Sequence, residues 1–405
     1  MNNPDVSSHP ATIPSTALIL GGGGARAAYQ VGVLDAMRQV LCELNNGDCP
    51  LPFKVLCGTS AGAINATALA SHAASFDTGI DKLLHVWRGF RPDQVYRTDL
   101  KGALLNAGHW FSALSMGWLI KEAPRSLFDN RPLRQLLEQH IDFHSIDTAI
   151  ARGHLEALAI STSSYSSGRH VTFYQSHHPI KPWTRSRRLA ARTTIGVDHL
   201  MASSAIPFVF PATRLQIDQT SGFFGDGAMR QNAPISPAIH LGARRIVVIG
   251  AGQVEENSGD SPSMDTDNQS EYPGLGQIGG HVMASIFLDG MASDVERLER
   301  INRTLNIMTT EQQQQTGLKP MDLLSITPSV RLDSLAEPFI RNLPATTRSA
   351  LRILGATGPR GVGLSSYLLF DRQYTRALIA LGQHDGLARS AEIARFFAGT
   401  IPDNN

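Results

Sequence analysis

The chain has 405 residues, of which 42% are hydrophobic and 18% are charged, so it is long enough to bury a large core. Its 36 basic and 35 acidic residues give a formal net charge of +1. This balance argues against a nucleic-acid-binding protein that relies on a broad cationic face. The composition is typical of a soluble globular protein built as one large domain or as one domain with a second layer.

The cysteines and the N-terminal residues indicate a cellular location. Cys42, Cys49 and Cys57 are too few and too clustered for a disulfide framework or a four-ligand zinc site. They favour a reducing compartment, and we expect a cytoplasmic protein. Residues 1–15 have no basic start and no long apolar stretch, so we expect a disordered lead rather than a signal peptide.

Strand-like and helix-like runs alternate over residues 16–250. The strand-like runs are residues 17–20, 53–57, 155–161, 171–174 and 245–249, with helix-like runs such as 25–44 and 61–74 between them. This alternation predicts βαβ units and an α/β core with a mostly parallel sheet.

The alternation of strand-like and helix-like runs ends after residue 250. We expect a flexible acidic loop over residues 251–276, because the stretch 255–271 holds six acidic residues and no basic ones. Residues 277–400 are predicted to be a mainly helical part that completes the fold. Within it, 277–305 is expected to form one long helix, and "DLLSIT" at 322–327 is expected to return a strand to the sheet. We find no internal repeats.

The pentapeptide "GTSAG", residues 58–62, stands between a strand-like and a helix-like run. A G-x-S-x-G turn in this place holds its serine in a tight conformation, and its glycines keep side chains away from the hydroxyl. The helix that follows points free N–H groups at charge that develops there. Ser60 is therefore a candidate nucleophile, with Gly58 and Gly62 forming its turn; an ordinary small-residue turn is the alternative.

Four glycines, Gly21, Gly22, Gly23 and Gly24, follow the first strand-like run, and Arg26 follows them. A dinucleotide site would require an acidic residue at the end of the second strand, which instead ends in Cys57. A phosphate-binding P-loop would require G-K-[ST], which is absent. An oxyanion hole requires donors near the serine, and two successive βα units place both glycine turns at the same edge of the sheet.

A nucleophilic serine needs a base. A hydrolase triad would place a histidine late in the chain, where His240, His281 and His384 occur. Only His384, in "LGQHDG", has a loop-like context, and we expect it on the surface. Asp226, in a Gly-Asp-Gly-Ala turn, is the better partner because it has no bulky neighbours; a plain Asp-Gly hairpin turn is the alternative.

Taken together, the motifs resemble the patatin-like phospholipases, in family order and over nearly the whole chain. They are "GGGGAR" with Tyr29 and Gly32 behind it, "GTSAG", "SLFDNRPLRQLL" from Ser126, "ASSAIPFVFPA" from Ala202, "DGA" from Asp226 with Asn232 and Pro234, and "SYLLFD" from Ser366. The resemblance implies a three-layer α/β/α fold with a mostly parallel central sheet and additional C-terminal helices. It also implies lipid acyl-ester hydrolysis with no metal and no cofactor.

The resemblance also implies residue roles. Ser60 and Asp226 would form a Ser-Asp dyad, with Gly227 and Ala228 shaping the turn of the proton acceptor. Gly21, Gly22, Gly23, Gly24 and Arg26 would form the oxyanion hole, in which we expect Arg26 to anchor the loop rather than bind substrate phosphate. The family usually carries glycine after this arginine, whereas this chain has Ala27; one added methyl group leaves the donors in place.

The expected partner is a lipid substrate at a membrane or micelle surface, with no nucleic acid; the oligomeric state is not predicted. An acyl-thioesterase that uses the same dyad, or a non-catalytic protein that binds lipid or another anion, are the alternatives. The uncharged stretch 103–120 is too polar for a transmembrane helix, so it is either core or a lid beside the active site. The stretch 181–192 has five basic residues and is either a solvated loop or helix start, or a contact for anionic lipid.

Overall fold

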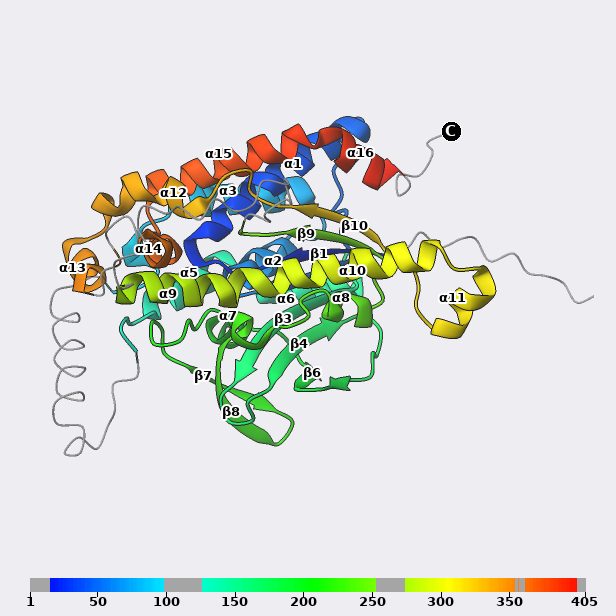
Figure 1. The fold of residues 1–405 in the computed structure, drawn as a ribbon, viewed down its shortest axis with the longest axis horizontal. Coiled ribbons are helices and arrows are strands. Elements are labelled where there is room, and N and C mark those ends of the chain that lie inside the picture. The colour runs from blue at the N-terminus through cyan, green and yellow to red at the C-terminus, as the bar shows by residue number, and fades with distance from the viewer. Residues whose placement is uncertain (1–14, 98–125, 253–273, 354–355, 357–360, 399–405) are drawn as a thin grey trace, which may run out of the picture.

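The computed structural model describes residues 15–97, 126–252, 274–353, 356 and 361–398 (Figure 1). The expected N-terminal lead up to residue 14, the uncharged stretch 103–120 and the acidic stretch 255–271 lie outside the described residues.

A ten-stranded mixed sheet forms the centre of the protein. Its main path runs β10-β9-β1-β2-β3-β4-β6-β5, and β8 pairs with both β3 and β7. Strands β10, β9, β1, β2 and β3 are mutually parallel, whereas β4 and β8 run antiparallel to β3. The predicted mostly parallel sheet is therefore confirmed. The strands are β1 (Thr16–Leu20), β2 (Val55–Thr59), β3 (Ala157–Ser164), β4 (His170–Ser176), β5 (Thr184–Arg185), β6 (Arg188–Arg192), β7 (Thr213–Ile217), β8 (Thr220–Asp226), β9 (Arg245–Ile249) and β10 (Asp322–Ile326).

Helices cover both faces of this sheet, as the central strand β1 shows. All five of its residues are buried, and successive side chains point to opposite faces. Leu18 and Leu20 belong to the core cluster that includes residues of α1, α2, α3 and α15, whereas Ala17 and Ile19 pack in a second cluster with residues of α8 and α10. The fold is therefore the three-layer α/β/α arrangement expected.

The helices account for most of the remaining described chain (Figure 1). They are α1 (Ala28–Leu44), α2 (Ala61–Ser71), α3 (Phe76–Arg88), α5 (Arg131–His140), α6 (Phe143–Ala151), α7 (Val197–Ser203), α8 (Ser236–His240), α9 (Leu275–Ala284), α10 (Gly290–Asn306), α11 (Thr310–Thr316), α12 (Leu332–Ala336), α13 (Ala345–Ile353), α14 (Val362–Leu368), α15 (Arg372–Ala388) and α16 (Ser390–Ala398). Shorter 3₁₀ segments are η1 (Gly24–Ala27), η2 (Pro92–Gln94), η3 (Gly227–Arg230) and η6 (Glu337–Asn342). No helix among the described residues is both long and apolar enough to span a bilayer.

Two predicted segments differ from the structure in detail. The single helix expected over 277–305 is continuous, but its middle turn, η5 (Ser285–Asp289), is π-helical. The stretch "LGQHDG" lies inside α15 rather than in a loop. Its two glycines permit the close packing of α15 on α1, since a Cβ at Gly382 would lie 2.2 Å from the carbonyl oxygen of Tyr29. His384 is exposed, as expected.

The basic stretch 181–192 is also different from the prediction. It forms the strands β5 and β6, not a loop or the start of a helix. Arg187 between them has a φ of 56°, which allows the chain to turn back sharply. The two strands extend the sheet beyond β4, with Arg188 of β6 in register with His170 of β4.

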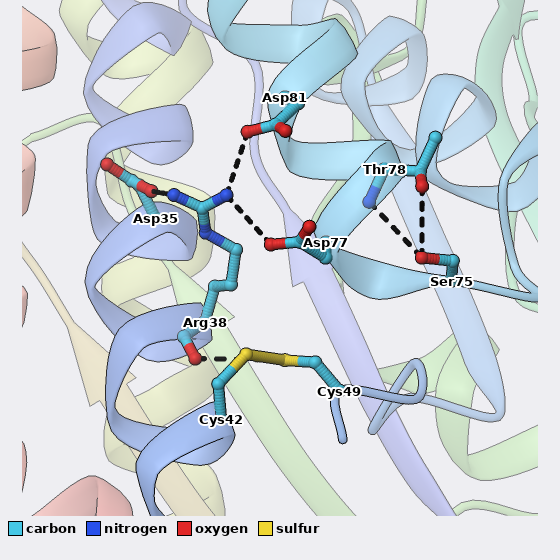
Figure 2. The surroundings of a disulfide bond; sticks show 8 residues. All are labelled: Asp35, Arg38, Cys42, Cys49, Ser75, Asp77, Thr78 and Asp81. Carbon is cyan, nitrogen blue, oxygen red and sulfur yellow. Dashed lines mark hydrogen bonds and ion pairs between the residues drawn. A yellow bond between two sulfur atoms is a disulfide. The ribbon is translucent and has the colours of Figure 1, made fainter. Parts of the chain in front are cut away.

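The expectation of reduced cysteines is wrong for one pair. Cys42 in the last turns of α1 forms a disulfide with Cys49 (Figure 2), because the turn after the helix brings their Cα atoms to 5.0 Å. Beside it, Arg38 of α1 donates hydrogen bonds to Asp77 and Asp81 of α3, which ties these two helices together. Cys57 is a buried free thiol, and burial raises its pKa to about 12.

Candidate active site

The two glycine turns lie at the same edge of the sheet. Strands β1 and β2 are parallel neighbours, with Leu20 opposite Gly58, so their carboxyl ends lie side by side. The turns are in close contact, because a Cβ at Gly62 would lie only 2.3 Å from the carbonyl oxygen of Leu20 and 2.4 Å from that of Gly21. Glycine is therefore required at position 62 for the helix α2 to approach the end of β1.

Ser60 has a strained backbone at the start of α2. Its φ of 55° is unusual for a residue other than glycine, and its side chain is only 2% exposed. The turn is held by Ser203, whose hydroxyl accepts a hydrogen bond from the Ser60 N–H at 2.9 Å and donates one to the carbonyl oxygen of Ser161 at 2.7 Å. Such a conformation presents the Ser60 hydroxyl away from the strand, as a nucleophile requires.

Asp226 is the last residue of β8, and its side chain is fully buried. It does not occupy a hairpin turn, since the chain continues from it into η3. Its Oδ1 accepts a hydrogen bond from the Ala228 N–H at 3.0 Å, whereas Oδ2 has no hydrogen-bond partner of normal geometry among the described residues. Gly227 allows this turn to lie on β3, because a Cβ there would come within 2.3 Å of the Ser161 carbonyl oxygen.

The surroundings of Asp226 change its acidity. Burial raises the pKa of the carboxyl group to about 7, against the lowering effect of hydrogen bonds from Ser60 and from the Ala228 N–H. The lowering effect of Ser60 on this pKa indicates that its hydroxyl faces the carboxyl group, while Oδ2 has no hydrogen bond of normal geometry among the described residues. Contacts of this kind tighten when a substrate binds.

The glycine loop contacts Ser60 directly. A Cβ at Gly22 would lie 3.1 Å from Cβ of Ser60, and only 2.6 Å from Cδ1 of Phe287 in the π-helical turn. The N–H groups of Gly22 and Gly23 have no hydrogen-bond acceptor among the described residues. Two backbone donors with no acceptor thus lie close to the candidate nucleophile.

Arg26 is held by protein groups. It is 5% exposed, and its Nε and Nη2 donate to the Ser366 hydroxyl at 2.8 and 2.6 Å. Nη2 also donates to the Gly363 carbonyl oxygen at 3.3 Å, and the guanidinium lies 4.1 Å above the ring of Tyr367. These contacts join the glycine loop to α14, which is the anchoring arrangement expected for this arginine.

An apolar cavity of about 80 Å³ starts at Ser60 and continues between α2, α3 and α5. We call it the acyl cavity. Ile64 and Ala68 line it along α2, and the polar side chains His72, Lys82 and His140 also belong to its lining. The remaining lining residues include Leu83, Val86, Trp87, Leu133, Leu136, Leu137, Phe210 and Phe370.

Three residues near the site were not found from the sequence. Ser203 fixes the Ser60 turn, Phe287 covers Gly22, and Gln231 joins Thr59 to Ser161 through hydrogen bonds of 2.8 and 3.0 Å. Ser203 does lie within the motif "ASSAIPFVFPA", but nothing local in the sequence shows that its hydroxyl reaches Ser60. Among the described residues, no three His, Cys, Asp or Glu side chains are grouped as metal ligands.

The bacterial protein named "cGAMP-activated phospholipase", from Pseudomonas aeruginosa, is 29% identical over 220 residues, which are 54% of this chain and 53% of that protein. This chain thus spans about half the length of that relative.

Solved structures that match this chain include human GIVD cytosolic phospholipase A2 in complex with methyl gamma-linolenyl fluorophosphonate. It is 13% identical at a TM-score of 0.41, over 95% of this chain and 59% of that one. VipD from Legionella pneumophila is 10% identical at a TM-score of 0.33, over 90% of this chain and 67% of that one. The sequence profile described as Patatin-like phospholipase matches residues 18–239, more than half of the chain. The chain therefore belongs to the patatin-like phospholipase family.

Proposed function

We propose that the protein is a lipid acyl hydrolase that cleaves fatty acyl esters, as a phospholipase A or a lysophospholipase does, with Ser60 as nucleophile and Asp226 as base. The observation that carries this proposal is the buried carboxyl group of Asp226 beside Ser60. Its pKa of about 7 leaves a substantial fraction ionised at neutral pH and makes it a far better base than an exposed aspartate.

The reaction proceeds in two steps. Asp226 accepts the proton of the Ser60 hydroxyl while the oxygen attacks the acyl carbonyl carbon, and the alcohol part of the lipid leaves with a proton from Asp226. Water then attacks the acyl-enzyme, giving its proton to Asp226, and Ser60 regains a proton as the fatty acid is released. The same carboxyl group serves as acid and base in both steps.

The negative charge of each tetrahedral intermediate needs preorganised donors. The N–H groups of Gly22 and Gly23 lie beside Ser60 with no acceptor of their own among the described residues, so we assign them to the oxyanion hole, with Gly21 and Gly24 shaping the loop. Arg26 holds the loop against α14. Loss of a donor of this kind typically lowers kcat by a factor of about 100 to 1000.

The acyl cavity suits a long hydrocarbon chain. Its lining includes Ser60, Ile64, Ala68 and His72 of the α2 region, and most of its other lining residues are apolar. Substrates with long acyl chains, presented by a membrane or a micelle, are therefore the proposed substrate class.

The experiment is fluorophosphonate labelling combined with a lipid panel in which released fatty acid is measured. We expect label and activity in the wild-type protein and in Ser71→Ala, a serine change at the other end of α2, and neither in Ser60→Ala. The assay is run with and without cGAMP, because the Pseudomonas relative is named for activation by it. Equal labelling of the wild-type protein and Ser60→Ala would overturn the assignment of the nucleophile.

A further inference from the structure

A second cavity, of about 330 Å³, lies between the β5–β6 segment, η3 and α10. Four arginines line it: Arg187, Arg188, Arg230 and Arg297. We call it the arginine pocket. Arg230 ends the η3 turn that Asp226 begins, so the pocket lies close along the chain to the candidate catalytic aspartate. None of its lining residues lines the acyl cavity.

The positive charge of the arginine pocket is compensated only in part among the described residues, by Asp294, which interacts with Arg297 and with the charge of Arg188. Asp294 of α10 forms an ion pair with Arg297 at 3.3 Å, and its other oxygen accepts a hydrogen bond from the Ile235 N–H at 3.0 Å. No carboxylate among the described residues forms an ion pair with Arg187, Arg188 or Arg230. The pocket therefore has an excess of cationic groups that a bound anion would balance.

Two buried nitrogen atoms also lack partners, one on Arg188 in the lining of the pocket and one on His170, the strand neighbour of Arg188. Nη1 of Arg188 and Nε2 of His170 are both buried, and neither has a hydrogen-bond partner among the described residues. Arg188 and His170 are paired residues of β6 and β4, so their side chains point to the same face of the sheet. Ala190 and Tyr174, which lie on this face two and four residues further along their strands, pack in the cluster that includes Ala238 and Leu298 of α8 and α10.

The unpartnered buried groups lower the stability of the folded protein. A buried donor without an acceptor costs free energy, and a buried cation costs more, unless a partner supplies the missing interaction. Burial, with the nearby charge of Arg188, lowers the pKa of His170 to about 4, so this imidazole is neutral at physiological pH. The pocket consequently offers several guanidinium groups, and a buried nitrogen of one of them, Arg188, lacks a partner among the described residues.

We infer that the arginine pocket binds a phosphate group, held by the guanidinium groups of Arg187, Arg188 and Arg230. The planar guanidinium group can donate two parallel hydrogen bonds to two oxygens of a phosphate, which makes arginine well suited to bind this group. The phosphate belongs either to a lipid headgroup or to a soluble phosphorylated molecule. This inference goes beyond the proposed hydrolysis and does not depend on it.

The test measures binding in the Ser60→Ala protein, so that vesicles are not degraded during the experiment. The pocket variant combines Arg187→Gln with Arg230→Gln, two exposed side chains whose replacement removes two charges from the pocket. The matched control combines Arg152→Gln with Arg303→Gln, two exposed arginines outside the pocket. Calorimetry with inorganic phosphate and with pyrophosphate probes the soluble source. Sedimentation with phosphatidylglycerol vesicles, compared with phosphatidylcholine vesicles, probes the lipid source.

We expect the pocket variant to bind one of these probes at least about tenfold more weakly, and the control to bind as the parent does. If the pocket variant binds only phosphate and pyrophosphate more weakly, the ligand is a soluble phosphorylated molecule. If it binds only phosphatidylglycerol vesicles more weakly, the ligand is a lipid headgroup. Equal weakening in both double variants, or no binding of any probe to the parent, overturns the inference. If the pocket variant has a lower melting temperature, Arg230→Gln alone repeats the measurement.

Discussion

The acyl cavity and the arginine pocket differ in which buried polar atoms lack a hydrogen-bond partner among the described residues. The acyl cavity is lined mainly by apolar side chains, and the unpartnered atoms there are oxygens: the Ser204 hydroxyl in its lining and Oδ2 of Asp226 near Ser60. At the arginine pocket the unpartnered atom is a nitrogen of Arg188. In the roles proposed above, desolvation would prepare a proton acceptor at one site and donors for an anion at the other.

The largest expected effect is the fall in activity when Ser60 or Asp226 is replaced. Ser60→Ala and Asp226→Asn should each lower kcat/KM for ester hydrolysis by about a thousandfold or more, because each removes half of one catalytic unit. For the same reason, the double variant should be little worse than either single one. Released fatty acid is the measurement, and circular dichroism checks that each variant is folded.

Near-normal turnover in Asp226→Asn would mean that another residue acts as the base. The sequence offers His384 as the alternative base, but this side chain lies exposed on α15. Ser71→Ala serves as the control, since its hydroxyl bonds only within the last turn of α2 and to His72.

The pH dependence should follow the pKa of Asp226. We expect kcat/KM to rise as pH increases through about 7 and then to level off, because the carboxylate form is the base. An activity profile that is flat between pH 5 and 8 would contradict the role of this carboxyl group.

The raised pKa of Asp226 also makes the stability of the folded protein depend on pH. The pKa of Asp226 is higher in the folded state than the value of about 4 for an unfolded chain, so the folded state binds the extra proton. This contribution to stability is complete below about pH 4 and is lost as pH rises through about 7. Relative to the wild-type protein, Asp226→Asn should therefore gain stability between pH 5 and pH 8, by a few kcal/mol at most. Melting temperatures at the two pH values measure this difference.

Much of the fold and part of the site could be predicted from local patterns. The alternation of strands and helices gave the parallel sheet, and the order of the first two βα units gave the shared edge of the two glycine turns. These inferences need only the periodicity of side chains and the direction of neighbouring strands.

The remaining features depend on contacts between distant segments. Ser203 is 143 residues from Ser60 in the sequence, and no local pattern identifies the hydrogen bond between them. The disulfide of Cys42 depends on how the chain turns after α1, and the basic stretch 181–192 becomes two strands because β4 offers a free edge for pairing. Phe287, which covers Gly22, lies in the π-helical turn, and the local sequence does not predict that turn.

A smaller effect is expected from narrowing the acyl cavity. Ala68 lines it two turns along α2 from Ser60, so Ala68→Phe should obstruct long acyl chains and leave short ones able to bind. We expect activity on a long-chain ester to fall about tenfold while a short soluble ester is cleaved at a similar rate, since a distal contact mainly affects binding of the chain. Ala68→Ser is the control, because it adds a single oxygen atom. Equal loss on both esters with a lower melting temperature would mean that overpacking, not obstruction, caused the effect.

The smallest effect concerns the stability of the arginine pocket. Removing Arg187 and Arg230 as the double Gln variant relieves repulsion among like charges that no carboxylate among the described residues pairs with. The melting temperature at low salt should therefore stay the same or rise slightly, corresponding to at most about 0.5 kcal/mol for exposed side chains. Added salt should reduce the difference, because it screens the repulsion in the wild-type protein. The double variant at Arg152 and Arg303 should show no such gain. A clear fall in stability for the pocket variant would mean that these arginines stabilise the fold, and the contrast between a cavity built for an acyl chain and a pocket kept open for an anion would fail.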